Sequence, residues 1–180
     1  MDKVVKYCKK YRDMGYTCAE STLMAANDAW GLDLDAKEFR ILGGFAGGYG
    51  LGDTCGAVSG GVAALSYKYL EVNGHESPLM MAKVRLFVSM VDEMLGMRNC
   101  RDLGPVYRNL EENCTPTVWA IAEILDDVES LDMSDIPAHS DYDLRFPPPG
   151  KPNGREIVDM DKLKERFRAI YKGEYRKTKA

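Results

Sequence analysis

Hydrophobic and polar positions along the chain repeat at helical rather than strand spacing. The clearest case covers residues 78–95, where apolar residues three and four apart mark one helix face: Met81, Val84, Phe87, Val88, Val91 and Leu95. No stretch of useful length alternates apolar and polar residues, as a half-buried strand would. The pattern therefore predicts an all-α fold, built as a compact multi-helix domain.

Capping residues set the expected ends of these helices. Thr17 and Glu20 have the spacing of a capping box, so a helix should begin there and end at Gly31. Thr54 is a suitable N-cap for a long helix over residues 55–72. Gly104-Pro105 is expected to break a short turn that opens near Asn99. Further helices are expected over residues 2–14, 34–42, 78–95 and 115–130.

The composition changes after residue 131 and predicts three regions. Residues 1–131 should form a helical cysteine-motif domain. Most of the eight prolines fall in residues 132–158, which predicts an extended proline-rich arm. Residues 159–180 are rich in lysine and arginine and predict a basic C-terminal helix.

Charge and hydropathy exclude several classes of partner. A net charge of −4 argues against nucleic acid, because phosphate binding requires a basic surface. No run approaches the roughly 20 apolar residues that span a bilayer, so no membrane association is expected. The first residues carry no apolar run of signal-peptide length, which favours a cytoplasmic location.

Four of the five cysteines fall at predicted helix starts: Cys18, Cys55, Cys100 and Cys114. Unpaired amides and the helix dipole at such positions favour the thiolate, which is the form that attacks disulfides and binds metals. No Cys-x-x-Cys occurs, so only tertiary packing could bring these sulfurs together. The alternative is that each is a small buried residue near a cap. Cys8 lies on an apolar helix face and is expected to be core packing.

The glycine-rich run over residues 43–52 matches no phosphate-binding motif. We expect its glycines to bend the backbone tightly beside Cys55 and to donate amides toward a thiolate or a cluster sulfide. The two histidines, His75 and His139, are expected to be exposed and incidental.

These cysteines and their surroundings resemble a known family. Cys18, then Cys55-Gly56-Ala57-Val58-Ser59-Gly60 behind the glycine-rich run, then Cys100 and Cys114, are similar to the redox-active family named for its C_GCAxxG_C_C pattern. That family resembles a domain of split-Soret cytochromes c. The resemblance covers roughly residues 5–128 and departs from the pattern at Thr54, where glycine is expected before the cysteine.

The resemblance implies a redox role and an iron–sulfur cluster. Carried over by position, Cys18, Cys55, Cys100 and Cys114 are the candidate catalytic and metal-binding residues, with Gly56 beside them at the cofactor. Four thiolates are the usual complement of such a cluster. Electron transfer through thiol/disulfide cysteine pairs is the second form of the same hypothesis. Covalent haem is not expected, because the chain has no Cys-x-x-Cys-His.

The expected partner is a redox protein that the sequence does not identify, with this chain acting as an oxidoreductase component. The proline-rich arm and the dimeric habit of the cytochrome relatives favour a homodimer. A different class of function stays open: a non-catalytic structural-metal or protein-interaction module whose cysteines only pack.

Overall fold

The computed structural model describes residues 3–132, which form seven α-helices and contain no strand. The helices are α1 (Val5–Asp13), α2 (Cys18–Trp30), α3 (Ala36–Arg40), α4 (Gly56–Tyr69), α5 (Pro78–Leu95), α6 (Cys100–Tyr107) and α7 (Thr115–Ser130). Two tight turns, Gly43–Phe45 and Gly48–Gly52, fill the glycine-rich run between α3 and α4. The all-α prediction is confirmed for these residues. The predicted arm and C-terminal helix fall, apart from Asp132, outside the described residues.

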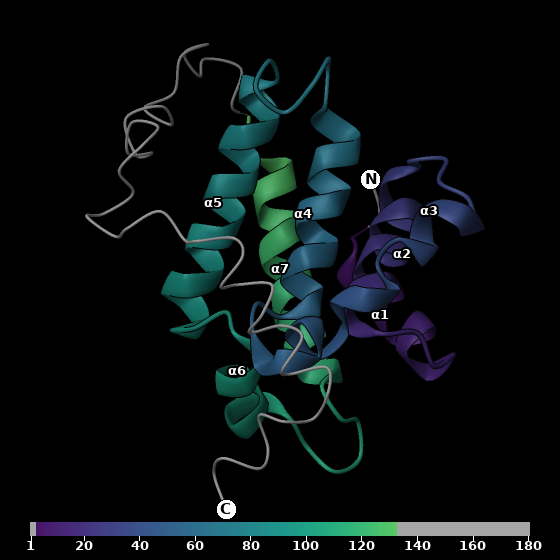
Figure 1. The fold of residues 1–180 in the computed structure, drawn as a ribbon, viewed down its shortest axis with the longest axis vertical. Coiled ribbons are helices and arrows are strands. Elements are labelled where there is room, and N and C mark those ends of the chain that lie inside the picture. Colours follow the sequence, from purple (N-terminus) through teal and green to yellow (C-terminus); the bar gives the residue numbers. More distant parts are fainter. Residues whose placement is uncertain (1–2, 133–180) are drawn as a thin grey trace, which may run out of the picture. The chain divides into compact units, whose positions relative to one another are not determined.

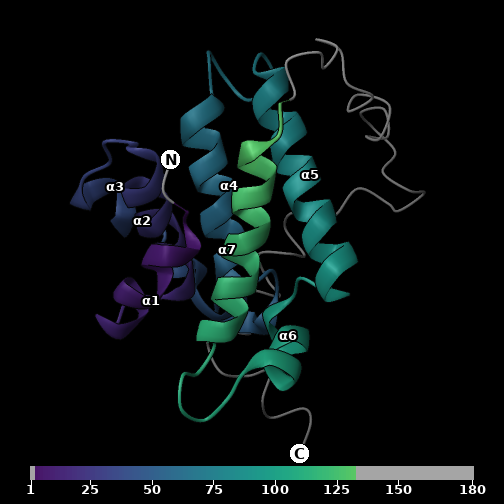
Figure 2. The ribbon, with the colours of Figure 1, turned by 180° about the vertical axis from the view of Figure 1, so that it is seen from behind.

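Helices α4, α5 and α7 pack against one another along most of their lengths, as both views show (Figure 1, Figure 2). Helices α1 and α2 pair beside them, with α2 against α4 and α1 against α7. Helix α6 lies near one end of this group, where it contacts α7 and the Gly48–Gly52 turn (Figure 2). The N-termini of α2, α4, α6 and α7 therefore fall in the part of the fold where the cysteines lie.

Helix α2 begins where the sequence predicts. The Thr17 amide donates to the Glu20 carboxylate at 2.9 Å, and the Glu20 amide donates to the Thr17 hydroxyl at 3.3 Å. This reciprocal capping box satisfies two amides that the first helical turn leaves unpaired. The helix ends at Gly31, which adopts a left-handed conformation with φ of 63°. Cys18 is thereby fixed as the first residue of α2.

Helix α4 is shorter than predicted at both ends. Its N-cap is Cys55 rather than Thr54, because Thr54 pairs with Asn99 in an isolated antiparallel bridge. Its last residue is Tyr69 rather than Val72, because the Ser77 hydroxyl takes up the amide of Glu71, at 3.0 Å. Capture of that amide by a side chain competes with continuation of the helix.

The segment around Gly104-Pro105 is helical, so the prediction that these residues break the turn is wrong. Pro105 lies inside α6. Proline normally disfavours a helical residue before it by clashing with that residue's Cβ. Gly104 has no Cβ, and this allows α6 to continue to Tyr107.

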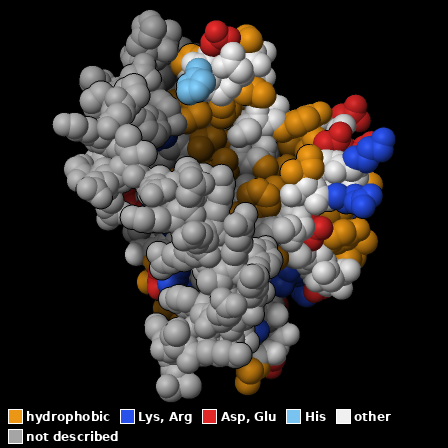
Figure 3. All heavy atoms as spheres, in the orientation of Figure 1, with side chains coloured by type: hydrophobic (Ala, Val, Ile, Leu, Met, Phe, Trp, Pro, Cys, Tyr) orange, Lys and Arg blue, Asp and Glu red, His pale blue; other side chains and the backbone are white. Residues whose placement is uncertain are grey.

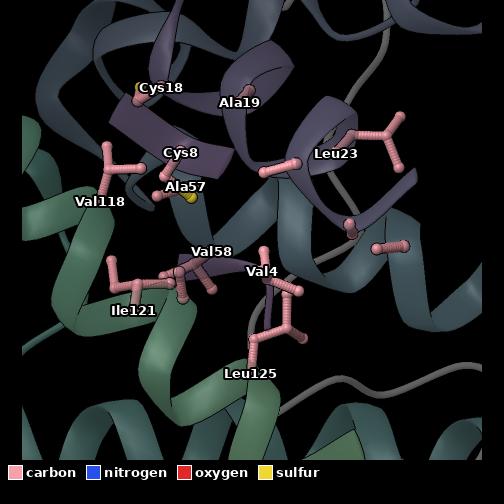
Figure 4. Packing of buried hydrophobic residues seen from close by; sticks show 14 of the residues in the cluster. Val4, Cys8, Cys18, Ala19, Leu23, Ala57, Val58, Val118, Ile121 and Leu125 are labelled. Carbon is pink, nitrogen blue, oxygen red and sulfur yellow. The ribbon is translucent and has the colours of Figure 1, made fainter. Parts of the chain in front are cut away.

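The core lies where α1, α2, α4 and α7 meet, and Cys8 is part of it. Figure 4 shows Cys8 among labelled side chains of α4 and α7, including Ala57 and Val118. Its side chain has no exposed surface, and burial, together with the nearby Asp126 carboxylate, raises the pKa of the thiol to about 12. The prediction that Cys8 is a packing residue is confirmed.

A buried lysine closes the C-terminus of α7. Lys83 on α5 is 2% exposed, and its ammonium donates to the carbonyls of Val128 at 2.8 Å, Glu129 at 3.0 Å and Leu131 at 2.9 Å. Carbonyls at a helix C-terminus have no intrahelical partners, so this cation both pairs them and complements the helix dipole.

Within residues 3–132 no helix is both long enough and apolar enough to cross a bilayer.

Candidate functional site

All four cysteines of the predicted site lie at helix N-termini. Cys18 and Cys100 are the first residues of α2 and α6, while Cys55 and Cys114 are the N-caps of α4 and α7. The helix-start prediction is therefore confirmed as geometry. Which sulfurs meet depends on how those four helix ends are held.

The isolated bridge between Thr54 and Asn99 aligns two of these helix ends. The Cys55 amide donates to the Arg98 carbonyl at 2.8 Å, and the Cys100 amide donates to the Asp53 carbonyl at 2.7 Å. Each of these bonds anchors the backbone of one cysteine to the strand-like segment of the other. The starts of α4 and α6 are thus fixed side by side, although 45 residues separate them in the sequence.

Two glycines allow the start of α4 to approach α2 closely. A Cβ at Gly56 would lie 2.4 Å from the Cys18 sulfur, and a Cβ at Gly60 would lie 2.4 Å from the Ala19 carbonyl oxygen. Both distances are far inside van der Waals contact. The sequence motif Cys55-Gly56-Ala57-Val58-Ser59-Gly60 therefore places glycine where the first turns of the two helices touch.

This contact brings Cys18 and Cys55 together as a hydrogen-bonded pair. The Cys55 thiol donates to the Cys18 sulfur, and this is the main reason that the pKa of Cys18 falls to about 6. The amides of Gly47 and Ala19 and the positive charge of Arg12 lower it further, against the opposing effect of burial. Cys18 is thus the sulfur of the pair that ionises more readily.

The pKa of Cys55, the second cysteine of the pair, shifts in the opposite direction from that of Cys18. The pKa of Cys55 is raised far above the usual thiol value, because its proton is held in the hydrogen bond to Cys18, because it is buried, and because the neighbouring Cys18 is negative. The Ala57 amide and the N-terminus of α4 offset only part of this. The pair therefore joins a sulfur that ionises readily to one that holds its proton, in residues that are 8% and 4% exposed.

Cys100 and Cys114 lie farther out and make different contacts. Both are partly exposed, and the Cys114 thiol donates to the Asn113 side-chain oxygen at 3.4 Å. Burial raises the pKa of Cys100, and the charges of Cys18 and Cys114 raise it further. Cys100 is therefore near both, but the hydrogen-bonded pair is Cys18–Cys55.

The cluster form of the sequence hypothesis requires several sulfurs around shared metal. Within residues 3–132 no group of three or more His, Cys, Asp or Glu side chains is arranged to hold a metal ion. The side chains as placed therefore do not fit an iron–sulfur cluster, and we derive no chemistry through one. Their arrangement instead matches what a dithiol needs: a low-pKa sulfur with a second sulfur in contact.

The cavities described here do not open onto the sulfurs. One of about 450 Å³ lies beside the bridge, and its described walls include Phe45, Tyr49, Thr54, Val58 and Arg98. Another, of about 160 Å³, lies between α2, α3 and α4, in the region where Figure 3 shows hydrophobic side chains next to charged ones. None of the described residues that line either cavity is a cysteine.

Sequence reasoning missed Arg12 but predicted the role of the glycine-rich run. Arg12 precedes the motif on α1, and a basic residue in the last turn of a helix gives no signal that its charge acts on a cysteine. The run donates an amide to a sulfur as expected, from Gly47 to Cys18. Gly48 allows the tight turn, since a Cβ there would lie 2.2 Å from the Asp53 carbonyl oxygen.

The fold and the site together define a helical protein with its motif cysteines at helix starts. Residues 16–128 match the family model described as "Putative redox-active protein (C_GCAxxG_C_C)", and the chain belongs to this family. The predicted family is thereby confirmed, with the match beginning after α1. No curated protein and no solved structure matches the chain.

Proposed function

We propose that this protein is a dithiol redox protein whose working centre is the Cys18–Cys55 pair. Oxidation of the pair forms one S–S bond and releases two electrons together with the Cys55 proton, and reduction reverses this. Cys18 is the attacking sulfur, because it is the thiolate, and Cys55 is the resolving sulfur, because it lies in contact with Cys18.

The observation that carries this proposal is the close approach of the first turns of α2 and α4, which brings Cys18 and Cys55 together with pKa values shifted in opposite directions. Two ordinary buried cysteines would both have raised pKa values, as Cys8 does. In the Cys18–Cys55 pair, the Cys55 proton and the amides of Gly47 and Ala19 instead stabilise one thiolate. Residues whose surroundings push their pKa values apart are a recurring mark of a functional site.

The test is disulfide mapping on the full chain. The reduced protein is treated with diamide, remaining thiols are blocked with N-ethylmaleimide, and the digested peptides are analysed by mass spectrometry. We expect one bond, Cys18–Cys55, which a phosphine reductant reopens. Cys18→Ser and Cys55→Ser should each abolish it, whereas the matched control Cys8→Ser should leave it intact. Slow oxidation with no preferred pair would instead support the packing-module alternative.

A redox partner protein and a homodimer remain proposals that rest on the sequence. The proline-rich segment that suggests assembly lies almost wholly outside the described residues. Sedimentation velocity of the full chain, reduced and oxidised, would measure the oligomeric state directly. A monomer at all concentrations would remove the dimer without affecting the thiol chemistry.

A further inference from the structure

The burial of the thiol pair restricts what can oxidise it. A thiolate that attacks a disulfide must line up with the S–S bond. Each sulfur of that disulfide also carries a carbon chain, which needs room. Cys18 is 8% exposed and Cys55 is 4% exposed. A hydroperoxide presents only two small oxygen atoms at the reacting bond. The geometry therefore favours a small oxidant over a protein disulfide.

Arg12 supplies the second group that such an oxidant requires. Its Nη1 donates to the Tyr16 carbonyl, which fixes the guanidinium, and its charge acts on the Cys18 sulfur. Its Nε is buried, and within residues 3–132 no group accepts a hydrogen bond from it. A buried N–H donor without a partner normally costs stability, so this one, on a side chain bonded to the Tyr16 carbonyl two residues before Cys18, is suited to binding a ligand.

We propose that the oxidant of the Cys18–Cys55 pair is a small hydroperoxide, bound beside Cys18 with the Arg12 Nε donating to its departing oxygen. This inference rests on the proposed dithiol function and adds the substrate class. Arg12 lies on α1, outside residues 16–128 that match the family, so the assignment comes from this chain's own fold.

The chemical step balances without a further reagent. The Cys18 thiolate attacks one oxygen, the O–O bond breaks, and the electron pair stays on the departing oxygen, which leaves as water or an alcohol after taking a proton. Cys18 is then a sulfenic acid. The Cys55 sulfur loses its proton and attacks the Cys18 sulfur, the S–O bond breaks, and water leaves. Two thiols and one hydroperoxide give one disulfide, one water and one water or alcohol.

The side chains around the pair favour both halves of this reaction. The guanidinium stabilises the charge that develops on the departing oxygen, where a preorganised donor is typically worth a factor on the order of 100 in rate. Cys55 already contacts Cys18, so the sulfenic acid is resolved without a rearrangement of the helices. In Cys55→Ser the second half cannot occur, and the sulfenic acid should accumulate.

The experiment compares oxidants on the reduced full chain. Hydrogen peroxide, cumene hydroperoxide and oxidised glutathione are added at equal concentrations, and Cys18–Cys55 bond formation is followed by thiol blocking and mass spectrometry. We expect hydrogen peroxide to be fastest and oxidised glutathione slowest. Dimedone should label Cys18 in Cys55→Ser after peroxide treatment, and should leave Cys8 unlabelled.

Two results separate this inference from the function on which it rests. If oxidised glutathione forms the bond as fast as hydrogen peroxide does, the hydroperoxide assignment is overturned and the dithiol function stands. If no tested oxidant, diamide included, forms the bond, both are overturned.

Arg12 is tested by a ratio that a purely structural role would not change. Alkylation by iodoacetamide also requires the Cys18 thiolate but involves no departing oxygen. Above pH 8 we expect Arg12→Gln to slow the peroxide reaction on the order of 100-fold relative to alkylation, and Arg12→Lys to restore part of it. Equal slowing of both reactions in Arg12→Gln would contradict the role assigned to the guanidinium.

Discussion

Gly56 and Cys18 touch so closely that a single methyl group between them would displace the sulfur. A Cβ at Gly56 would lie 2.4 Å from the Cys18 sulfur and 3.0 Å from the Phe45 carbonyl oxygen. The first turn of α4 thus packs directly on the nucleophile that begins α2. The sequence predicts Gly56 at a cofactor, and in the structure its missing side chain leaves room for the Cys18 sulfur.

Gly56→Ala should therefore damage both the stability and the chemistry. Overpacking of a close helix contact costs about 1–3 kcal/mol, and here relief requires movement of the Cys18 sulfur or of α4. We expect lower stability in urea denaturation and a slower Cys18–Cys55 oxidation. Gly44→Ala is the matched control, because a Cβ there meets nothing within 4 Å. Equal stability and equal oxidation rates in the two variants would show that the close approach of Gly56 to Cys18 contributes to neither.

The pH profile of Cys18 reports the hydrogen bond from Cys55. The pKa of Cys18 is lowered to about 6, so its alkylation rate should rise through that pH and level off above about pH 7. In Cys55→Ala the donor is absent and burial remains, so the rise should move to higher pH. Iodoacetamide rates from pH 4 to 10, followed on the Cys18 peptide, measure both profiles. An unchanged profile in the variant would mean that Cys55 does not activate Cys18.

Reactivity at neutral pH should not follow exposure. Cys100 is more exposed than Cys18, but burial and the negative sulfurs nearby raise its pKa. We expect Cys18 to react with a small alkylating reagent before Cys100 at pH 7, because the thiolate is the nucleophile. Timed alkylation with heavy and light iodoacetamide gives the order. Earlier labelling of Cys100 would contradict the assignment of Cys18 as the activated sulfur.

Lys83→Met should destabilise the domain without changing the thiol chemistry. The substitution leaves three carbonyls at the end of α7 unpaired, and we expect a loss of about 2 kcal/mol in the free energy of unfolding. Lys9→Met is a suitable control, because the Lys9–Asp13 pair is exposed to solvent and should contribute little to stability. Urea denaturation of both variants measures the difference. Comparable losses of stability in the two variants would show that the Lys83 ammonium does not stabilise the C-terminus of α7.

Most of the fold could be predicted because its signals are local. The Thr17 capping box, the Ser77-Pro78 start and the three-four spacing along α5 each act within a few residues. The exceptions depend on distant partners. Thr54 does not cap α4, because it pairs with Asn99, which lies 45 residues away. Nothing near Thr54 in the sequence indicates that bridge.

The candidate site also combines features that local sequence predicts with features that depend on tertiary packing. The positions of Cys18 and Cys55 at helix starts are local facts and were predictable. Their contact depends on the packing of α2 against α4, and Arg12 enters from α1 only through tertiary structure. Periodicity and caps give no information on which helix ends meet, so the pairing of Cys18 with Cys55 could not be predicted from the sequence.

The most direct measurement is the intact mass and thiol count of the oxidised and re-reduced protein, with the bonded peptides identified. A reversible loss of two hydrogens, located to a Cys18–Cys55 bond and leaving Cys8 free, is the predicted result. A protein that instead purifies anaerobically with stoichiometric iron and sulfide, and loses them when any one of Cys18, Cys55, Cys100 or Cys114 is replaced, would contradict the dithiol account.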